Sequence, residues 1–223
     1  MSSPLIPAAP AGAVPELAFA IEDAARVDHA AVPTLRFALR ITGPAERPIK
    51  SVLLDTQIQI AARRRRYDDA AEERLFELFG APAGWGSTLR TLPWTRTTSV
   101  VAPFTTSTIV DLLVPCSYDL DVAASRYFDA LADGEVPLEF LFSGTVFAAG
   151  PAGMLQATRI SRETDAEFRF PVRVWKETME RFFGATAWVR LDKRAFDRLT
   201  AFRSRHALAS WEQAVDALLE GRE

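Results

Sequence analysis

The stretch LEFLFSGTVF, residues 138–147, decides the fold. Phe140, Phe142 and Val146 share one face of an extended chain and Leu141 and Phe147 share the other, because successive side chains of a strand point to opposite sides. Apolar residues on both faces are typical of a strand that is buried on both sides. The stretch therefore predicts a central strand of a sheet whose two faces are both covered.

Further extended segments precede this strand. Apolar side chains alternate with arginine and alanine over residues 35–41, and a second extended run covers residues 52–60. Residues 100–104 and 108–114 are expected to form another pair of strands that ends at Pro115, since proline has no N–H group for a central ladder. Alternation of this kind predicts half-buried strands, so the chain is expected to contain a mainly antiparallel sheet.

Short helices are expected between the strands. Asp68 or Asp69 is placed to cap a helix with an apolar face, and Gly80 is placed to end it, because glycine readily adopts the left-handed conformation of a C-terminal cap. A second short helix is expected over residues 121–131, where apolar residues follow the helical period.

The last fifty residues change to a helical pattern. Pro171 precedes an amphipathic segment, a position that suits the first turn of a helix. A short strand is expected over 185–191, and Ser210 with Gln213 forms a capping-box pattern before the last apolar stripe. This pattern predicts a C-terminal helical hairpin.

The expected fold class is therefore α+β: a mainly antiparallel β-sheet or β-sandwich with inserted short helices and a C-terminal helical hairpin. Residues 1–15, rich in proline and alanine, are expected to form a disordered leader. Residues 16–223 are expected to form a single α+β domain that is β-rich to about 170 and has a helical part over 171–219. An all-β domain followed by a separate helical domain is the alternative.

Composition excludes several classes of function. The net charge of -3 gives no overall positive field to attract nucleic acid. The single cysteine, Cys116, and the two histidines, His29 and His206, are not spaced as metal ligands. No segment has the length and apolar character of a membrane span or of a secretory signal. We therefore expect a cytoplasmic protein with no metal, no cofactor, no nucleic-acid partner and no membrane span.

Four consecutive arginines, Arg63, Arg64, Arg65 and Arg66, form the most concentrated charge in the chain. One interpretation is a solvated strand end that acids of the following turn neutralise. The other is a protein-binding surface for an acidic partner, since alternate arginines of an extended segment project together. The residues alone favour the first interpretation and leave the second open.

Four other residues are candidates for lining a pocket between the sheet and the helices: Trp85, Trp94, Cys116 and Tyr118. The alternative for the two tryptophans is a role as core anchors under a loop. Cys116 follows Pro115 at the end of an apolar run, which is typical of a buried structural thiol. No arrangement of residues indicates a catalytic nucleophile, so no catalytic residue is assigned.

Several segments, taken in order along the chain, resemble an uncharacterised bacterial family of unknown function that is encoded among nickel-iron hydrogenase genes. The segments are Arg64-Arg65-Arg66-Tyr67, Val114-Pro115-Cys116-Ser117-Tyr118, Ala124-Ser125-Arg126-Tyr127-Phe128, Glu135-Val136-Pro137 and Phe142-Ser143-Gly144-Thr145-Val146-Phe147. The resemblance spans about residues 16–219. It implies a setting in hydrogenase expression or assembly and no catalytic residues.

The expected function is therefore that of a non-enzymatic accessory or assembly protein that acts by binding another protein. In the setting that the resemblance implies, the candidate partners are a hydrogenase subunit and a maturation factor. The alternative is a small-ligand-binding or enzymatic domain with a pocket between the sheet and the helices.

Overall fold

The computed structural model describes residues 16–45, 47–117, 119, 122–150, 154–161, 164–184, 186 and 189–221. The expected leader, 1–15, lies outside the described residues. The chain divides into two compact units, Met1–Thr186 and Ala187–Glu223. We describe each unit by itself.

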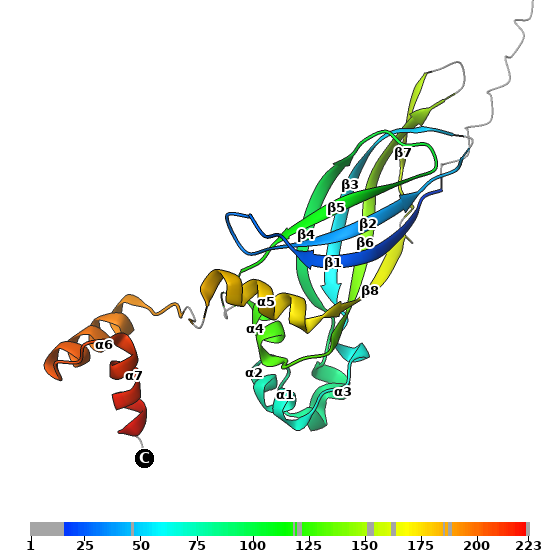
Figure 1. Cartoon of the computed structure of the whole chain (residues 1–223). Coiled ribbons are helices and arrows are strands. Elements are labelled where there is room, and N and C mark those ends of the chain that lie inside the picture. The colour runs from blue at the N-terminus through cyan, green and yellow to red at the C-terminus, as the bar shows by residue number, and fades with distance from the viewer. Residues whose placement is uncertain are drawn as a thin grey trace, which may run out of the picture. The chain divides into compact units, whose positions relative to one another are not determined.

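The first unit contains two antiparallel sheets (Figure 1). Sheet A has the order β1-β2-β5 and is built from β1 (Ala18–Arg26), β2 (Thr34–Thr42) and β5 (Ser107–Pro115). Sheet B has the order β4-β3-β6-β7, with β8 also paired to β6. Its strands are β3 (Ile49–Ile60), β4 (Leu92–Val101), β6 (Glu135–Ala149), β7 (Leu155–Arg159) and β8 (Asp165–Pro171). The predicted fold class, α+β with mainly antiparallel sheet, is confirmed.

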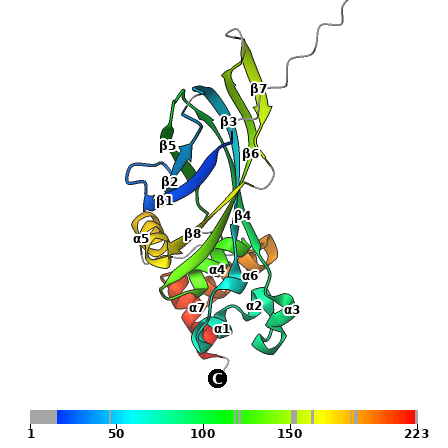
Figure 2. The same cartoon turned by 90° about the vertical axis from the view of Figure 1, so that its right-hand side faces the viewer.

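Aromatic side chains join the two sheets into a sandwich. Phe37 on β2 lies 5.3 Å, centroid to centroid, from Phe140 on β6, and Phe19 on β1 stacks on Phe142 at 4.4 Å. Figure 2 shows the two sheets as facing layers. The predicted alternation in residues 35–41 is confirmed, because all of its large apolar side chains are buried in this core.

The strand β6 is central, as predicted. It pairs with β3 along one edge and with β7 and β8 along the other. Phe140, Phe142 and Val146 are buried, but Leu141 on the opposite face is 39% exposed. The expectation that both faces are covered is therefore wrong, because sheet A packs against only one face of sheet B.

The pair of strands expected over 100–104 and 108–114 is not formed. β4 ends at Val101 and pairs with β3 in sheet B, whereas β5 pairs with β2 in sheet A. The chain changes sheet between them, where Phe104 is buried and forms a bridge with Ile49. β4 also begins earlier than the sequence indicates, at Leu92.

Short helices gather at one end of the sandwich (Figures 1 and 2). Between β3 and β4 the chain forms η1 (Ala62–Arg64), α1 (Asp69–Arg74), α2 (Phe76–Phe79), η2 (Pro82–Gly84) and α3 (Trp85–Thr88). The predicted cap is present, since the Asp68 carboxylate accepts a hydrogen bond from the Ala71 N–H at 2.8 Å. Gly80 ends α2 with a φ of 73°.

Two longer helices complete the first unit. They are α4 (Ala123–Ala130), within the segment predicted as the second helix, and α5 (Val172–Phe183), which begins after Pro171. Phe128 of α4 stacks on Trp175 of α5 with ring centroids 4.7 Å apart. The helical part predicted from residue 171 is thus divided, because α5 belongs to the first unit.

The second unit is the predicted helical hairpin, formed by α6 (Lys193–Arg205) and α7 (Trp211–Glu220). The Ser210 hydroxyl accepts a hydrogen bond from the Gln213 N–H at 3.2 Å, as the capping pattern predicts. Of the strand expected over 185–191, residues 189–191 are in no strand. Residues 185, 187 and 188 lie outside the described residues.

Candidate functional sites

Three of the four consecutive arginines hold distant parts of the first unit together. Arg63 Nε donates to the Leu89 carbonyl at 2.5 Å, which ties η1 to the segment after α3. Arg65 Nη1 donates to the Glu135 carbonyl at 2.7 Å, and its Nη2 donates to the Asp133 carbonyl at 2.6 Å. These guanidinium groups satisfy backbone carbonyls that begin or precede strands.

Arg64 forms ion pairs instead. Its guanidinium contacts Glu167 on β8, and its Nη2 lies 3.1 Å from a carboxylate oxygen of Glu139 on β6. The hydrogen bond to Glu167, followed by the charge of Glu139, raises the pKa of Arg64. Acids on sheet B therefore neutralise this arginine, rather than the acids of the next turn. Arg66 is exposed and has no partner in the described part of the chain.

The two predicted tryptophans occupy different parts of one aromatic core. Trp85 is buried, donates from Nε1 to the Gly80 carbonyl at 2.8 Å and meets the Tyr67 ring edge-on at 5.2 Å. Trp94 is half-buried on β4 and lies 4.9 Å, centroid to centroid, from Phe128. Both are packing residues here; that they line a common pocket stays a prediction.

Cys116 is buried at the end of β5. Its thiol lies 3.3 Å from the Val114 carbonyl oxygen and donates to it. Burial raises the pKa of the Cys116 thiol to about 12, so the thiolate form is scarce at neutral pH. The predicted structural role fits this environment. The fourth pocket candidate, Tyr118, lies outside the described residues.

A pair of tyrosines was missed by the sequence analysis as a candidate feature. The hydroxyls of Tyr67 and Tyr127 lie 2.8 Å apart, and the Tyr67 hydroxyl also lies 2.8 Å from the Ala62 carbonyl oxygen. Burial raises the pKa of both phenols, so both stay neutral at physiological pH. Nothing local in the sequence brings together two residues 60 positions apart.

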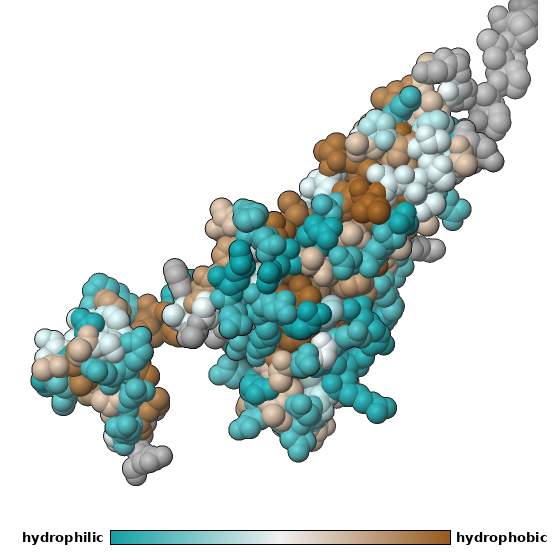
Figure 3. Space-filling view, in the orientation of Figure 1, coloured by the Kyte–Doolittle hydropathy of each residue, from teal (hydrophilic) through white to brown (hydrophobic). Residues whose placement is uncertain are grey.

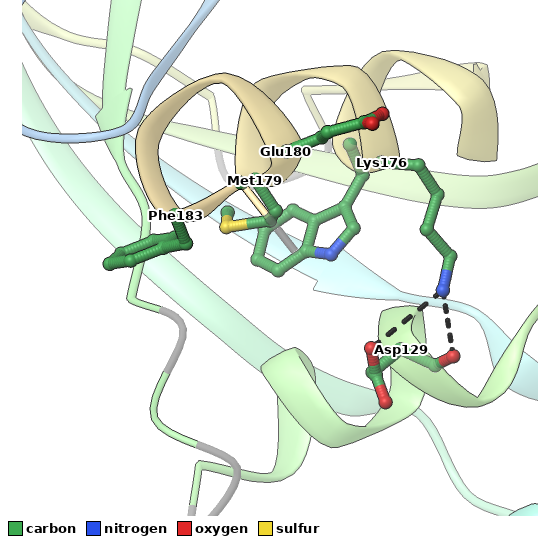
Figure 4. A pocket seen from close by; sticks show the side chains of 7 residues that line it. Asp129, Lys176, Met179, Glu180 and Phe183 are labelled. Atoms are coloured by element: carbon green, nitrogen blue, oxygen red, sulfur yellow. Dashed lines mark hydrogen bonds and ion pairs between the residues drawn. The ribbon is translucent and has the colours of Figure 1, made fainter. Parts of the chain in front are cut away.

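A hollow of about 210 Å³ lies between α4 and α5 (Figure 4). Asp129 from α4 and Lys176, Met179, Glu180 and Phe183 from α5 line it, together with Trp175. Lys176 donates to the Asp129 carbonyl at 2.8 Å. The indole nitrogen of Trp175 is buried and has no hydrogen-bond partner among the residues that the structure describes, which is unusual for a buried donor.

The outer face of sheet B carries exposed or half-buried apolar side chains on four adjacent strands, β4, β3, β6 and β7. We call Val100, Leu53, Phe147 and Leu155 the apolar row. Val100 on β4 lies opposite Leu53 on β3. Phe147 on β6 pairs with Ser51, which lies two residues before Leu53 on the same face of β3. Leu155 on β7 pairs with Ala149, two residues after Phe147 on the same face of β6. Val100 is 75% exposed, Leu155 is 66% exposed and Leu53 is 45% exposed.

Two classes of feature are absent from the described residues. No group of three or more histidine, cysteine, aspartate or glutamate side chains is placed to hold a metal ion there. Within the same ranges, every helix falls short of the length and apolar character that crossing a membrane requires.

Comparisons with known proteins give one family and distant structural likenesses. No curated protein matches the chain. Among solved structures, β-glucosidase 3B from Thermotoga neapolitana in complex with α-D-glucose is 13% identical, with a TM-score of 0.25, over 70% of this chain and 17% of that chain. Spo0M, a sporulation control protein from Bacillus subtilis, is 8% identical, with a TM-score of 0.25, over 70% of this chain and 49% of that one. This chain therefore spans less than half of those proteins.

The model of a family of unknown function matches residues 14–223, which is nearly the whole chain. The expectation of an uncharacterised family is thereby confirmed. The chain belongs to the family of unknown function DUF6084.

Proposed function

We propose that this chain is a non-enzymatic accessory protein that acts by binding another protein through the apolar row on sheet B. The observation that carries the proposal is the exposure of Val100, Leu53 and Leu155 beside the half-buried Phe147 on the outer face of sheet B. Because the outer face of an antiparallel sheet is ordinarily polar, apolar side chains on four adjacent strands there support a role in protein binding.

The surroundings of the apolar row resemble the rim of a protein interface. The Asp55 carboxylate accepts hydrogen bonds from Arg96 Nε at 2.8 and 2.9 Å, next to Leu53 and Val100 on the same face. This hydrogen bond holds the pKa of Asp55 below its usual range. An apolar centre with a charged, solvated edge is the usual anatomy of a binding surface.

The resemblance described above supplies the setting of the proposal. The partner is proposed to be a nickel-iron hydrogenase subunit or maturation factor, and the site of action the cytoplasm. The four-arginine segment is a weaker candidate for this contact, since Arg63, Arg64 and Arg65 already bind groups within the first unit.

Substituting the apolar row tests the proposal. In Val100→Arg/Leu155→Arg, we expect recovery of a hydrogenase subunit or maturation factor to fall at least about tenfold, because buried charge without a partner is costly at an interface. The measurement is a tagged isolation at native expression level, followed by quantitative mass spectrometry. Unfolding temperatures should stay close to that of the parent chain, since both side chains are exposed.

The matched control lies on the other sheet. Ile109 and Leu113 are 52% and 50% exposed on β5. Asp111 lies between them, and Arg40 and Arg36 of β2 lie opposite them. Ile109→Arg/Leu113→Arg should leave recovery unchanged. Equal losses in both double variants, or recovery of none of these partners with the parent chain, would contradict the proposal.

The hollow between α4 and α5 supports a second candidate function, the binding of a small polar ligand. Its basis is the polar lining formed by Asp129, Lys176 and Glu180 beside Trp175. The buried indole N–H of Trp175 has no acceptor among the described residues. A neutral carbonyl compound suits the hollow better than an anion, because both Asp129 and Glu180 line it.

N-methylacetamide is a suitable probe of this hollow. If the site binds carbonyl groups, titration should move the indole N–H resonance of Trp175, assigned with Trp175→Phe. The resonance of Trp211, in the second unit, is the internal reference. Movement of both resonances to the same extent would show a solvent effect and remove this candidate.

A further inference from the structure

We propose that the hairpin of α6 and α7 is a dimerisation element, and that its partner is the same hairpin of a second copy of this chain. The proposal concerns the second unit, 187–223, and does not depend on the apolar row. It rests on three properties of the hairpin: its small core, a basic stripe on α6 and an acidic stripe on α7.

The hairpin buries very little by itself. Ala214 is the one buried residue among the described residues 189–221. The contacts within the hairpin leave large apolar side chains uncovered, and Figure 3 shows apolar surface beside α7. They are Val189, Leu191, Phe196, Val215, Leu218 and Leu219, each at least 43% exposed. A unit of this size needs a partner to bury enough apolar surface for stability.

The first stripe is basic and lies on α6. Arg194, Arg198 and Arg205 are spaced by four and seven residues, which places them on one face of the helix. All three are exposed. The other cations of α6 already have partners, because Lys193 pairs with Asp197 and Arg203 lies over the Trp211 ring at 3.9 Å. The three stripe arginines have no acidic partner in the described part of the chain.

The second stripe is acidic and lies on α7. Glu212, Asp216 and Glu220 repeat every four residues, so they also share one helix face. All three are exposed. No ion pair joins this stripe to the arginines of α6 within the described residues. Each hairpin therefore presents two opposite charge patterns that do not neutralise one another internally.

A second copy of the chain can neutralise the basic stripe of α6 and the acidic stripe of α7 at the same time. In a two-fold symmetric dimer, a contact of the α6 stripe with the partner's α7 stripe is repeated by symmetry, so each contact occurs twice. A different protein with an acidic surface would neutralise only the arginine stripe. Val215 and Leu219 each follow an acid of the α7 stripe by three residues, so they flank that stripe on the helix. The same approach of two hairpins would therefore cover these two exposed side chains.

Analytical ultracentrifugation of the full chain tests this inference. We expect the parent chain to be a dimer at roughly 100 µM. Reversal of one stripe in R194E/R198E/R205E, or of the other in E212R/D216R/E220R, should raise the dimer dissociation constant at least about tenfold. Like charges then face each other at both contacts of the symmetric dimer.

Mixing the α6 variant with the α7 variant tests whether the two stripes contact each other. In the mixed dimer one contact has both charges reversed and the other has the parental charges, so we expect a heterodimer to form. Far-ultraviolet circular dichroism must show unchanged helix content in each variant before mixing. The variant Val100→Arg should dimerise like the parent, which separates this inference from the proposed function.

Three results would overturn the inference. The first is that the parent chain is monomeric at roughly 100 µM. The second is a dimer that persists in both reversed variants, which would place the interface elsewhere. The third is a pair of folded variants that fail to associate on mixing.

Discussion

Gly144→Ala is expected to destabilise the first unit by about 3 kcal/mol or more, although it adds only one methyl group. Gly144 has a φ of 141°, a conformation that residues with a Cβ rarely adopt. A Cβ built there would lie 2.0 Å from the carbonyl oxygen of Leu53 on the neighbouring strand β3. That oxygen belongs to the backbone of a central strand, so it has little freedom to move away.

The position of Gly144 explains why the strand needs this conformation. β6 pairs with β8 up to Leu141 and with β7 from Thr145 onward, along the same edge. Between these segments, the Phe142 N–H donates to the Thr164 carbonyl and the Gly144 carbonyl accepts from the Ile160 N–H, both at 3.1 Å. Gly144 therefore lies where β6 exchanges one partner strand for the other.

Urea unfolding of Gly144→Ala beside Gly86→Ala measures the effect. Gly86 in α3 has open space around its Cβ position and no positive φ, so its substitution should change the unfolding free energy by less than about 1 kcal/mol. A loss at Gly144 no larger than that at Gly86 would show that β3 and β6 can separate locally at little cost.

The sequence predicted those elements whose side-chain pattern is strong and local. The alternation of residues 35–41 and the phenylalanines of β6 predict strands because one face of each is fully buried. The caps at Asp68 and Ser210 could be predicted because a capping side chain binds a backbone N–H only three residues away. In each case the controlling interaction lies within the element itself.

Edge strands gave a weaker signal. β4 reads LPWTRTTSVV, where threonine and serine occupy several positions and Pro93 resembles a turn residue. As an edge strand it is only half-buried, so its sequence does not need the apolar alternation of a central strand. The exposed face of sheet B was also misjudged, because apolar residues on both faces of β6 resemble a doubly covered strand.

The roles of the arginines depend on contacts that no local pattern contains. Arg64 meets Glu167 across 103 positions and Arg65 meets the Glu135 carbonyl across 70. The sequence identified the charge at this segment but could not identify its partners, since these depend on how β6 and β8 pair. By contrast, the stripes of α6 and α7 follow directly from helical periodicity once the helix bounds are known.

Phe37→Ala is expected to cost the first unit about 3–5 kcal/mol of unfolding free energy. Phe37 on β2 is fully buried and reaches across the sandwich to sheet B. Its ring centroid lies 5.3 Å from that of Phe140 and 5.6 Å from that of Phe170. Trp94 meets it edge-on at 6.0 Å. Truncation would leave a cavity where β2, β4, β6 and β8 converge.

The matched control for Phe37→Ala is Leu113→Ala, on the outer face of the same sheet. Leu113 is 50% exposed, so its truncation should cost less than about 1 kcal/mol. Urea unfolding followed by tryptophan fluorescence reports the difference, because Trp94 lies in the affected core. Similar losses at the two positions would mean that the sheets do not depend on this aromatic cluster. A large loss at Phe37 alone would establish that the inner aromatic layer, rather than the outer faces, holds the sandwich together.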